Sequence, residues 1–315
     1  MNRPDKYSVP AVLELTVAIC THDPRPEFLA RTLAALRDQT LTTDRWELLM
    51  IDNASAVPLA PRWPLDWHPG ARHIVEPALG IAAARMRAMR EARAGLLLFV
   101  DDDNLLAPDY AARALAYAAT EPSLGCFGGQ LVPEFETPPE EWTHPWWKYL
   151  AIRPLAADRR AIGPRHYDAI PPTAGMTVRR AVWERYLQLC ACDPRHLRLG
   201  VWGQRRVGGE DLDLALCAFD LGLGAACFAG LTATHLMPAV RLTEDYLVQL
   251  VEGIAFSTVI LEGLRPAVGL DQPRAGFFAS LREQVRAWRL PRREGRFYQA
   301  ELRGRRSGYA TLAQS

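Results

Sequence analysis

The sequence predicts an α/β protein with a doubly wound, mainly parallel β-sheet. Short apolar runs alternate with segments of helical periodicity along the first 120 residues. This β-α-β order is typical of a parallel sheet with helices on both faces. Neither G-x-G-x-x-G after the first strand nor G-x-x-x-x-G-K-[ST] is present, so dinucleotide-binding and Walker-type sites lose their main support.

The first half contains four apolar runs that predict strands, at residues 13–20, 46–51, 72–76 and 96–100. The run at residues 96–100 is short and shows no polar alternation, as expected for a strand buried on both faces. Helices are predicted from Pro26, a residue suited to the first helical position, to about Asp38 and over the alanine-rich residues 80–93. A further amphipathic stretch follows Pro108.

The second half is less regular. Residues 124–135 predict a region of paired strands, and residues 136–172 are long, irregular and rich in proline. Further strands are predicted at residues 173–178 and 225–235. Helices are predicted at residues 180–189, 210–221, 244–264 and 275–290.

Three consecutive aspartates, Asp101, Asp102 and Asp103, follow the strand at residues 96–100. The carboxyl ends of strands line the ligand crevice of an open α/β sheet. In an extended segment Asp101 and Asp103 would point to one side and Asp102 to the other. Converging carboxylates need a cation, and hard oxygen ligands suit Mg²⁺ or Mn²⁺ and the phosphates they bind. The alternative is helix capping, which requires only one aspartate.

A second acidic cluster begins the helix predicted at residues 210–221. Gly208 and Gly209 allow a sharp turn into this helix, and Glu210 and Asp211 lie in its first turn, where the helix dipole stabilises anions. Alone, the cluster fits helix capping equally well. Together, the two clusters predict one acidic site for a metal and a diphosphate, and a second that supplies a carboxylate base to an incoming hydroxyl.

Several segments, in this order, resemble the family 2 glycosyltransferases, which have the GT-A fold. They are THDPRPEFLARTLAALRDQT, WELLMIDNAS, LGIAAARMRAMREARAGLLLFVDDDN, TAGMTVRRAVWERY, GGEDLDLALCAFDLGLG and THL. The resemblance implies a GT-A domain over residues 1–240. It would have a Rossmann-like nucleotide-sugar-binding half at about 11–123 and an acceptor half at about 124–240. A helical, arginine-rich extension at 241–315 would follow.

Carried over by position, the resemblance implies a role for individual residues on the donor side. Thr21 would line the nucleotide, Asp52 would accept hydrogen bonds from the base, and Arg85 would hold the base or the diphosphate. Asp101 would approach the ribose or the metal, with Asp102 beside it in the donor site. Asp103 would bind Mn²⁺ or Mg²⁺, as the second aspartate of a DXD motif, and His235 would be a further metal ligand.

On the acceptor side, the resemblance implies that Asp211 is the general base and that Glu210 contacts the acceptor. Trp202 is similar to the tryptophan loop of β-1,4-galactosyltransferases, which closes over the donor. The implied reaction is an inverting transfer of a hexosyl or related group from a nucleotide-diphosphate sugar, with a UDP-sugar favoured, to a saccharide, lipid-linked or other hydroxyl acceptor. It would serve polysaccharide, glycolipid or other glycoconjugate biosynthesis. A nucleoside diphosphate leaves without a separate acid, so one carboxylate suffices.

Two other classes of protein fit the pattern less well. A nucleotidyltransferase of similar fold should have a G-x-G-T-R-type loop after the first strand, where this chain has THDPRP. A non-catalytic nucleotide-sugar-binding protein could lose Asp103 or Asp211, and both are present. The extra Pro24 in the first loop, and Met86 where the family often has Asn, leave the identity of the nucleotide base open.

The net charge of +1 argues against a dedicated nucleic-acid partner. No apolar signal core precedes residue 13, and six cysteines without a paired motif indicate reduced thiols, so a cytoplasmic location is expected. Residues 272–306 carry ten arginines and three glutamates, which makes them a candidate for peripheral contact with the inner face of the membrane. The alternative is a helix packed on the domain or on another subunit. Trp142, Trp146 and Trp147 fit either stacking on an acceptor sugar or covering the sheet.

Overall fold

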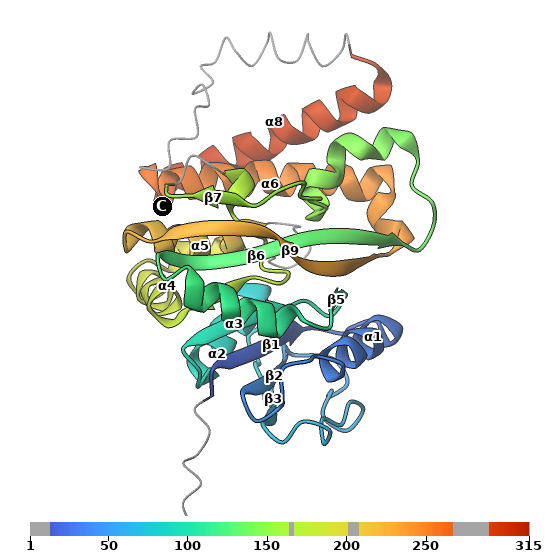
Figure 1. Ribbon diagram of the computed structural model, residues 1–315. Helices are drawn as coiled ribbons and strands as arrows, with labels where there is room; N and C mark the ends of the chain where they lie inside the picture. The colour runs from blue at the N-terminus through green and yellow to red at the C-terminus, as the bar shows by residue number, and fades with distance from the viewer. Residues whose placement is uncertain (1–12, 164–166, 201–207, 267–289, 315) are drawn as a thin grey trace, which may run out of the picture.

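The computed structural model describes residues 13–163, 167–200, 208–266 and 290–314 (Figure 1). The strands within these residues are β1 (Leu15–Thr21), β2 (Trp46–Asp52), β3 (Ala71–Val75), β4 (Leu96–Val100), β5 (Asn104–Leu106), β6 (Leu124–Phe135), β7 (Arg159–Ala161), β8 (Thr177–Arg179) and β9 (Gly224–Met237). The α-helices are α1 (Pro26–Arg37), α2 (Ile81–Glu91), α3 (Tyr110–Thr120), α4 (Arg180–Cys192), α5 (Glu210–Asp220), α6 (Glu244–Leu264) and α8 (Arg292–Ala313). Short 3₁₀ helices are η1 (Glu141–Leu150), η2 (Tyr167–Ala169), η3 (Pro194–Leu199) and η4 (Ala239–Leu242).

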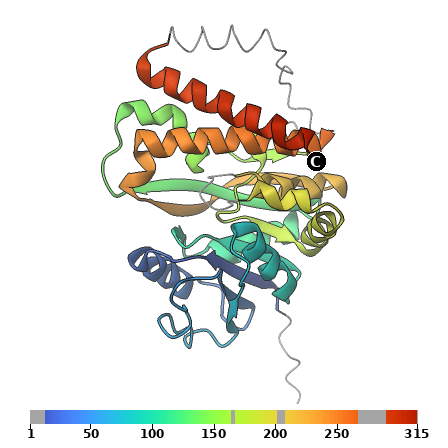
Figure 2. The same ribbon diagram turned by 180° about the vertical axis from the view of Figure 1, so that it is seen from behind.

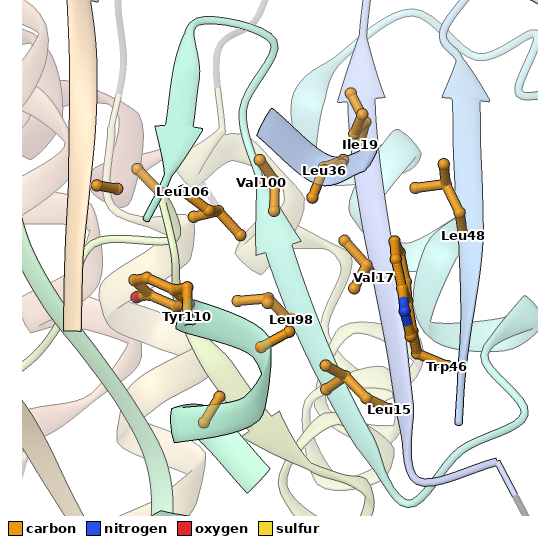
Figure 3. Packing of buried hydrophobic residues seen from close by; sticks show 14 of the residues in the cluster. Leu15, Val17, Ile19, Leu36, Trp46, Leu48, Leu98, Val100, Leu106 and Tyr110 are labelled. Atoms are coloured by element: carbon orange, nitrogen blue, oxygen red, sulfur yellow. The ribbon is translucent and has the colours of Figure 1, made fainter. Parts of the chain in front are cut away.

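These strands form one mixed sheet in the order β3-β2-β1-β4-β8-β6-β9-β5, with β7 paired to β9. The first four are mutually parallel, as predicted, and β8 joins them antiparallel to β4. Alternate side chains of β1 pack into the hydrophobic cores on opposite faces of the sheet. Val17 and Ile19 pack with α1 and α3 on one face (Figure 3), and Ala18 packs with α2, α4 and α5 on the other. The predicted doubly wound α/β sheet is confirmed.

Two predictions in the second half are wrong in detail. Residues 124–135 form one long strand rather than a strand pair, because β6 runs parallel to β9 along its whole length and needs no hairpin partner. The predicted strand at residues 173–178 begins only at Thr177. Gly175, with φ of 84°, breaks the regular strand, although its backbone still hydrogen-bonds to Phe99 of β4.

The C-terminal helices α6 and α8 lie side by side beyond β6 and β9, at the end of the molecule opposite β1, β2 and β3 (Figures 1 and 2). The predicted helical C-terminal extension is present, although the sequence pattern did not place a separate helix at α8. The helix predicted at residues 275–290 lies almost wholly outside the described residues. Phe297 anchors α8 in a core shared with α6 and η1. Trp146 stacks on Phe297 with a centroid distance of 3.8 Å, and Trp142 lies 6.4 Å from it. Both tryptophans therefore cover the helical layer.

Much of the positive charge of α8 is balanced within the fold. Arg296 contacts both Glu244 and Asp245, and Arg303 contacts Glu252, all on α6. Among the described helices, α6 alone is long and apolar enough to cross a membrane, and half of its most apolar 18-residue stretch is buried inside the protein. Membrane contact through the arginine-rich segment therefore stays a prediction, as does the domain boundary at residue 240.

Candidate active site

A cleft of about 600 Å³ opens at the carboxyl ends of β1 and β4, beside the start of α5. Both acidic clusters line it: Asp101, Asp102 and Asp103 from the first, and Glu210 and Asp211 from the second. The other predicted site residues in its lining are Thr21, Arg85 and His235. Segments more than 100 residues apart in the sequence thus share one crevice, as predicted.

Arg85 connects the two clusters. Its position in the second turn of α2, which packs on β1 and β2, directs the guanidinium into the cleft. One nitrogen lies 3.2 Å from Oδ1 of Asp101, and the other donates to Oε1 of Glu210. Burial alone would lower the pKa of Arg85, but Glu210 and Asp101 raise it above its ordinary value, so Arg85 stays charged. Burial raises the pKa of Glu210 to about 7, against the opposing effect of Arg85.

The three aspartates do not alternate along an extended strand. They lie in a turn, in which the Asn104 amide donates to the Asp101 carbonyl over 3.1 Å. The carboxylates consequently reach three different partners: Asp101 pairs with Arg85, Asp102 accepts from the hydroxyl of Thr21, and Asp103 pairs with Arg241. The prediction of an extended conformation at these three residues is therefore wrong. Burial, together with the neighbouring Asp103, raises the pKa of Asp102 to about 7.

Sheet register brings Asp103 to His235. β5 pairs antiparallel with β9 so that Asn104 faces His235, and the Leu236 amide donates to the Asp103 carbonyl over 2.8 Å. Oδ2 of Asp103 then lies 3.5 Å from Nε2 of His235 and 2.9 Å from Nη2 of Arg241. Arg241 lies on η4, between β9 and α6, and the sequence analysis did not assign it to the site. The sequence feature that could have assigned Arg241 to the site is its position six residues after His235.

The predicted metal ligands are only partly brought together. No group of three or more His, Cys, Asp or Glu side chains with metal-binding geometry occurs among the residues described, and the carboxylate of Asp101 is engaged by Arg85. Asp103 and His235 remain as a pair of oxygen and nitrogen donors that face each other in the cleft. Mg²⁺ is typically held by one or two carboxylates and completes its shell with phosphates and water. The pair therefore fits a divalent ion that arrives with a diphosphate.

The predicted base, Asp211, lies half-buried in the first turn of α5, where Gly209, with φ of 156°, turns the chain into the helix. The same helix is anchored by Asp213, which is fully buried. Its oxygens lie 2.6 Å from Nδ1 of His196 and 2.9 Å from Nε of Arg265. This anchor fixes the position of Asp211 relative to the cleft, and the sequence analysis did not identify it.

The roles assigned to all of these site residues stay predictions, and three residues fit their expected roles least directly. Asp52 ends β2 as expected, but its oxygens accept from the amides of Ser55 and Leu59, and the neighbouring Asn53 lines the cleft instead. The carboxylate of Glu210 is engaged by Arg85, so its contact with an acceptor would require rearrangement. Trp202 lies outside the described residues.

The sequence profile described as Glycosyl transferase family 2 matches residues 16–184, which is more than half of the chain. The chain belongs to this family. It is a glycosyltransferase. A comparison with curated protein sequences gave no significant match.

Solved structures with the GT-A fold resemble this family 2 glycosyltransferase at low sequence identity. GalNAc-T7, crystallised with UDP, GalNAc and Mn²⁺, is 16% identical with a TM-score of 0.52; the match covers 87% of this chain and 55% of that one. S. aureus TarS, residues 1–349, is 10% identical with a TM-score of 0.48; the match covers 96% of this chain and 92% of that one. At these identities the likeness to GalNAc-T7 supports the fold.

The Asp103 carboxylate of this glycosyltransferase should make folding pH-dependent. Burial opposes ionisation, but the positive charge of Arg241 favours it, and the pKa of Asp103 is held at about 2, below the ordinary value of 3.8. The ionised group thus contributes about 2 kcal/mol, present above pH 3.8 and lost as the pH falls through 2. Urea unfolding of the wild type and Asp103→Asn should show a stability difference that shrinks between pH 6 and pH 3. A difference independent of pH over this range would show that Asp103 is not held ionised by its neighbours.

Proposed function

We propose that this glycosyltransferase transfers a sugar from a UDP-sugar to a hydroxyl acceptor with inversion of the anomeric configuration. The observation that carries the proposal is the one cleft that Asp211 lines together with Asp101 and Asp103, which pair with Arg85 and Arg241. UDP and a divalent ion are favoured because GalNAc-T7, which shares the fold, was crystallised with UDP, GalNAc and Mn²⁺.

The nucleotide would lie along the loop after β1, where Thr21, His22 and Asn53 line the cleft. Its diphosphate would then approach Asp103 and His235, which would hold Mn²⁺ or Mg²⁺. When bound, the ion would neutralise the charge that develops on the leaving diphosphate. Arg85, which stays charged and lines the cleft, would add a second, fixed positive charge.

The reaction needs one base. Asp211 would accept the proton of the acceptor hydroxyl while the hydroxyl oxygen forms a bond to the anomeric carbon. The bond from that carbon to the diphosphate oxygen breaks on the opposite face, and its electron pair leaves with the nucleoside diphosphate. Because attack and departure occur on opposite faces, the configuration inverts. A single carboxylate suffices because the leaving group does not require protonation.

The remaining wall of the cleft is apolar and aromatic. Tyr149 and Leu150 from η1 face Tyr246 and Leu250 from α6. Aromatic rings suit the apolar faces of sugars, so this wall is the proposed acceptor side. We also propose that the acceptor is a saccharide or a lipid-linked molecule and that the reaction serves glycoconjugate biosynthesis. The same proposal includes a cytoplasmic location for the protein.

A thermal-shift screen of UDP-, TDP- and GDP-sugars, each with Mn²⁺ or with EDTA, tests the donor. A ligand that binds only the folded state at 100 times its Kd stabilises it by about 2.7 kcal/mol. We expect UDP-sugars with Mn²⁺ to give the largest rise in Tm and EDTA to abolish most of it. An equal rise with GDP-sugars would contradict the UDP assignment. A rise with no nucleotide sugar would contradict the proposed donor class.

A further inference from the structure

Arg241 places its guanidinium against both groups proposed to hold the metal. Nη2 lies 2.9 Å from Oδ2 of Asp103, and Nη1 lies 3.0 Å from Nε2 of His235. Asp103 is almost wholly buried, so Arg241 supplies most of its compensating charge. Arg241 therefore contacts the same Asp103 oxygen and His235 nitrogen that are proposed to bind the metal.

The same contact fixes the state of His235. A guanidinium N–H can only donate, so Nε2 of His235 accepts with its lone pair. The ring proton then resides on Nδ1, which is buried and has no hydrogen-bond partner among the residues described. This is the tautomer that coordinates a metal through Nε2. Arg241 thus donates a hydrogen bond to the same Nε2 lone pair that would bind a metal ion.

The guanidinium and a divalent ion exclude each other. An ion held by Asp103 and His235 would lie about 2.1 Å from each donor atom. The nitrogens of Arg241 stand only 2.9 and 3.0 Å from the same two atoms. Both cations cannot use these donors together, and their like charges repel at this range.

We propose that Arg241 is an intrinsic competitor for the divalent metal site of this protein. In the absence of donor it neutralises Asp103, and it must swing away before a metal ion can bind. Its side chain is 31% exposed and belongs to the short η4 turn, which is not part of the sheet, so the swing requires no movement of a strand. The displaced guanidinium is then available to a phosphate of the donor. This inference rests on the proposed function, because the displacing ion is the one proposed to arrive with the diphosphate.

The test is Mn²⁺ affinity in the absence of nucleotide, measured from the EPR signal of free Mn²⁺. Arg241→Gln removes the competing charge and should bind Mn²⁺ at least tenfold more tightly than the wild type. Arg241→Lys keeps the charge and should stay within about threefold of the wild type. Arg31→Gln is the matched control: Arg31 pairs with Glu134 on the surface, outside the cleft, and its loss should leave Mn²⁺ affinity unchanged. A thermal melt confirms that each variant is folded.

Repeating the Mn²⁺ titration in the presence of UDP distinguishes a failure of the proposed Arg241 competition from a failure of the proposed metal–diphosphate site. If Arg241→Gln binds Mn²⁺ no more tightly than the wild type, while UDP raises the Mn²⁺ affinity of both, the competition is disproved and the proposed metal-diphosphate site stands. If neither protein binds Mn²⁺ with or without UDP, the metal site and the competition both fail. A tenfold gain in Arg241→Gln that the Lys variant does not share supports competition by charge at this site.

Discussion

Asp211→Asn is expected to lower kcat for glycosyl transfer by about a hundredfold to ten-thousandfold. The amide keeps the size and shape of the side chain but cannot accept the proton of the acceptor hydroxyl, and general-base catalysis of this kind contributes about 10²–10⁴-fold to a rate. None of the proposed donor contacts is made by Asp211, so the Kd for the nucleotide sugar should change by no more than about threefold. Steady-state kinetics and a donor titration on the same preparation measure both quantities.

The control for this substitution is Asp109→Asn. Asp109 is exposed and pairs with Arg113 on the surface at the start of α3, so the same chemical change there should leave kcat and Kd unaltered. If Asp211→Asn retained wild-type turnover, Asp211 would not be the base. If it lost donor binding and turnover together, its role would lie in the donor site.

Arg85→Met is expected to lower the free energy of unfolding by about 3 kcal/mol at pH 8, because methionine preserves bulk but leaves two carboxylates without their cation. Removing one member of a buried ion pair typically costs about 3–5 kcal/mol. Glu210 can lessen this cost by taking up a proton, since burial already raises its pKa to about 7. The loss should therefore be largest above pH 7 and smaller at pH 5. Urea unfolding at the two pH values measures the difference.

Arg113→Met provides the comparison for Arg85→Met. Arg113 forms an exposed pair with Asp109, and such pairs contribute about 0–1 kcal/mol. A loss in Arg85→Met no larger than in Arg113→Met would mean that Arg85 does not hold the two acidic clusters together. An equal loss of unfolding free energy at pH 5 and pH 8 would mean that Glu210 is not the carboxylate left without a cation when Arg85 is removed.

Local sequence signals were sufficient for much of the fold. The apolar run of β4 and the fully buried strands β1 and β2 leave no polar face, so their place inside a parallel sheet could be predicted. The helical periodicity after Gly209 located α5 to within a residue. Because parallel strands end at one edge of a sheet, their polar endings could also be assigned to one cleft.

Other features depend on contacts between distant segments. The turn at residues 101–103 is set by the pairing of β5 with β9, which sends the three carboxylates to three partners, and nothing within the aspartate run indicates this. Arg241 enters the site only because β9 carries His235 to Asp103 and η4 follows at once. The helix α8 has a weakly apolar sequence and is stabilised by packing on α6 and the tryptophans of η1, so its periodicity alone did not predict it.

The most direct test of a shared donor and metal cleft is the anomalous diffraction signal of Mn²⁺ in crystals grown with UDP. The account predicts one strong peak within coordination distance of Asp103 and His235, with Arg241 turned away and the diphosphate on the side of the cleft that faces Asp211. A Mn²⁺–UDP complex bound elsewhere on the protein, with Asp103 still paired to Arg241, would contradict it.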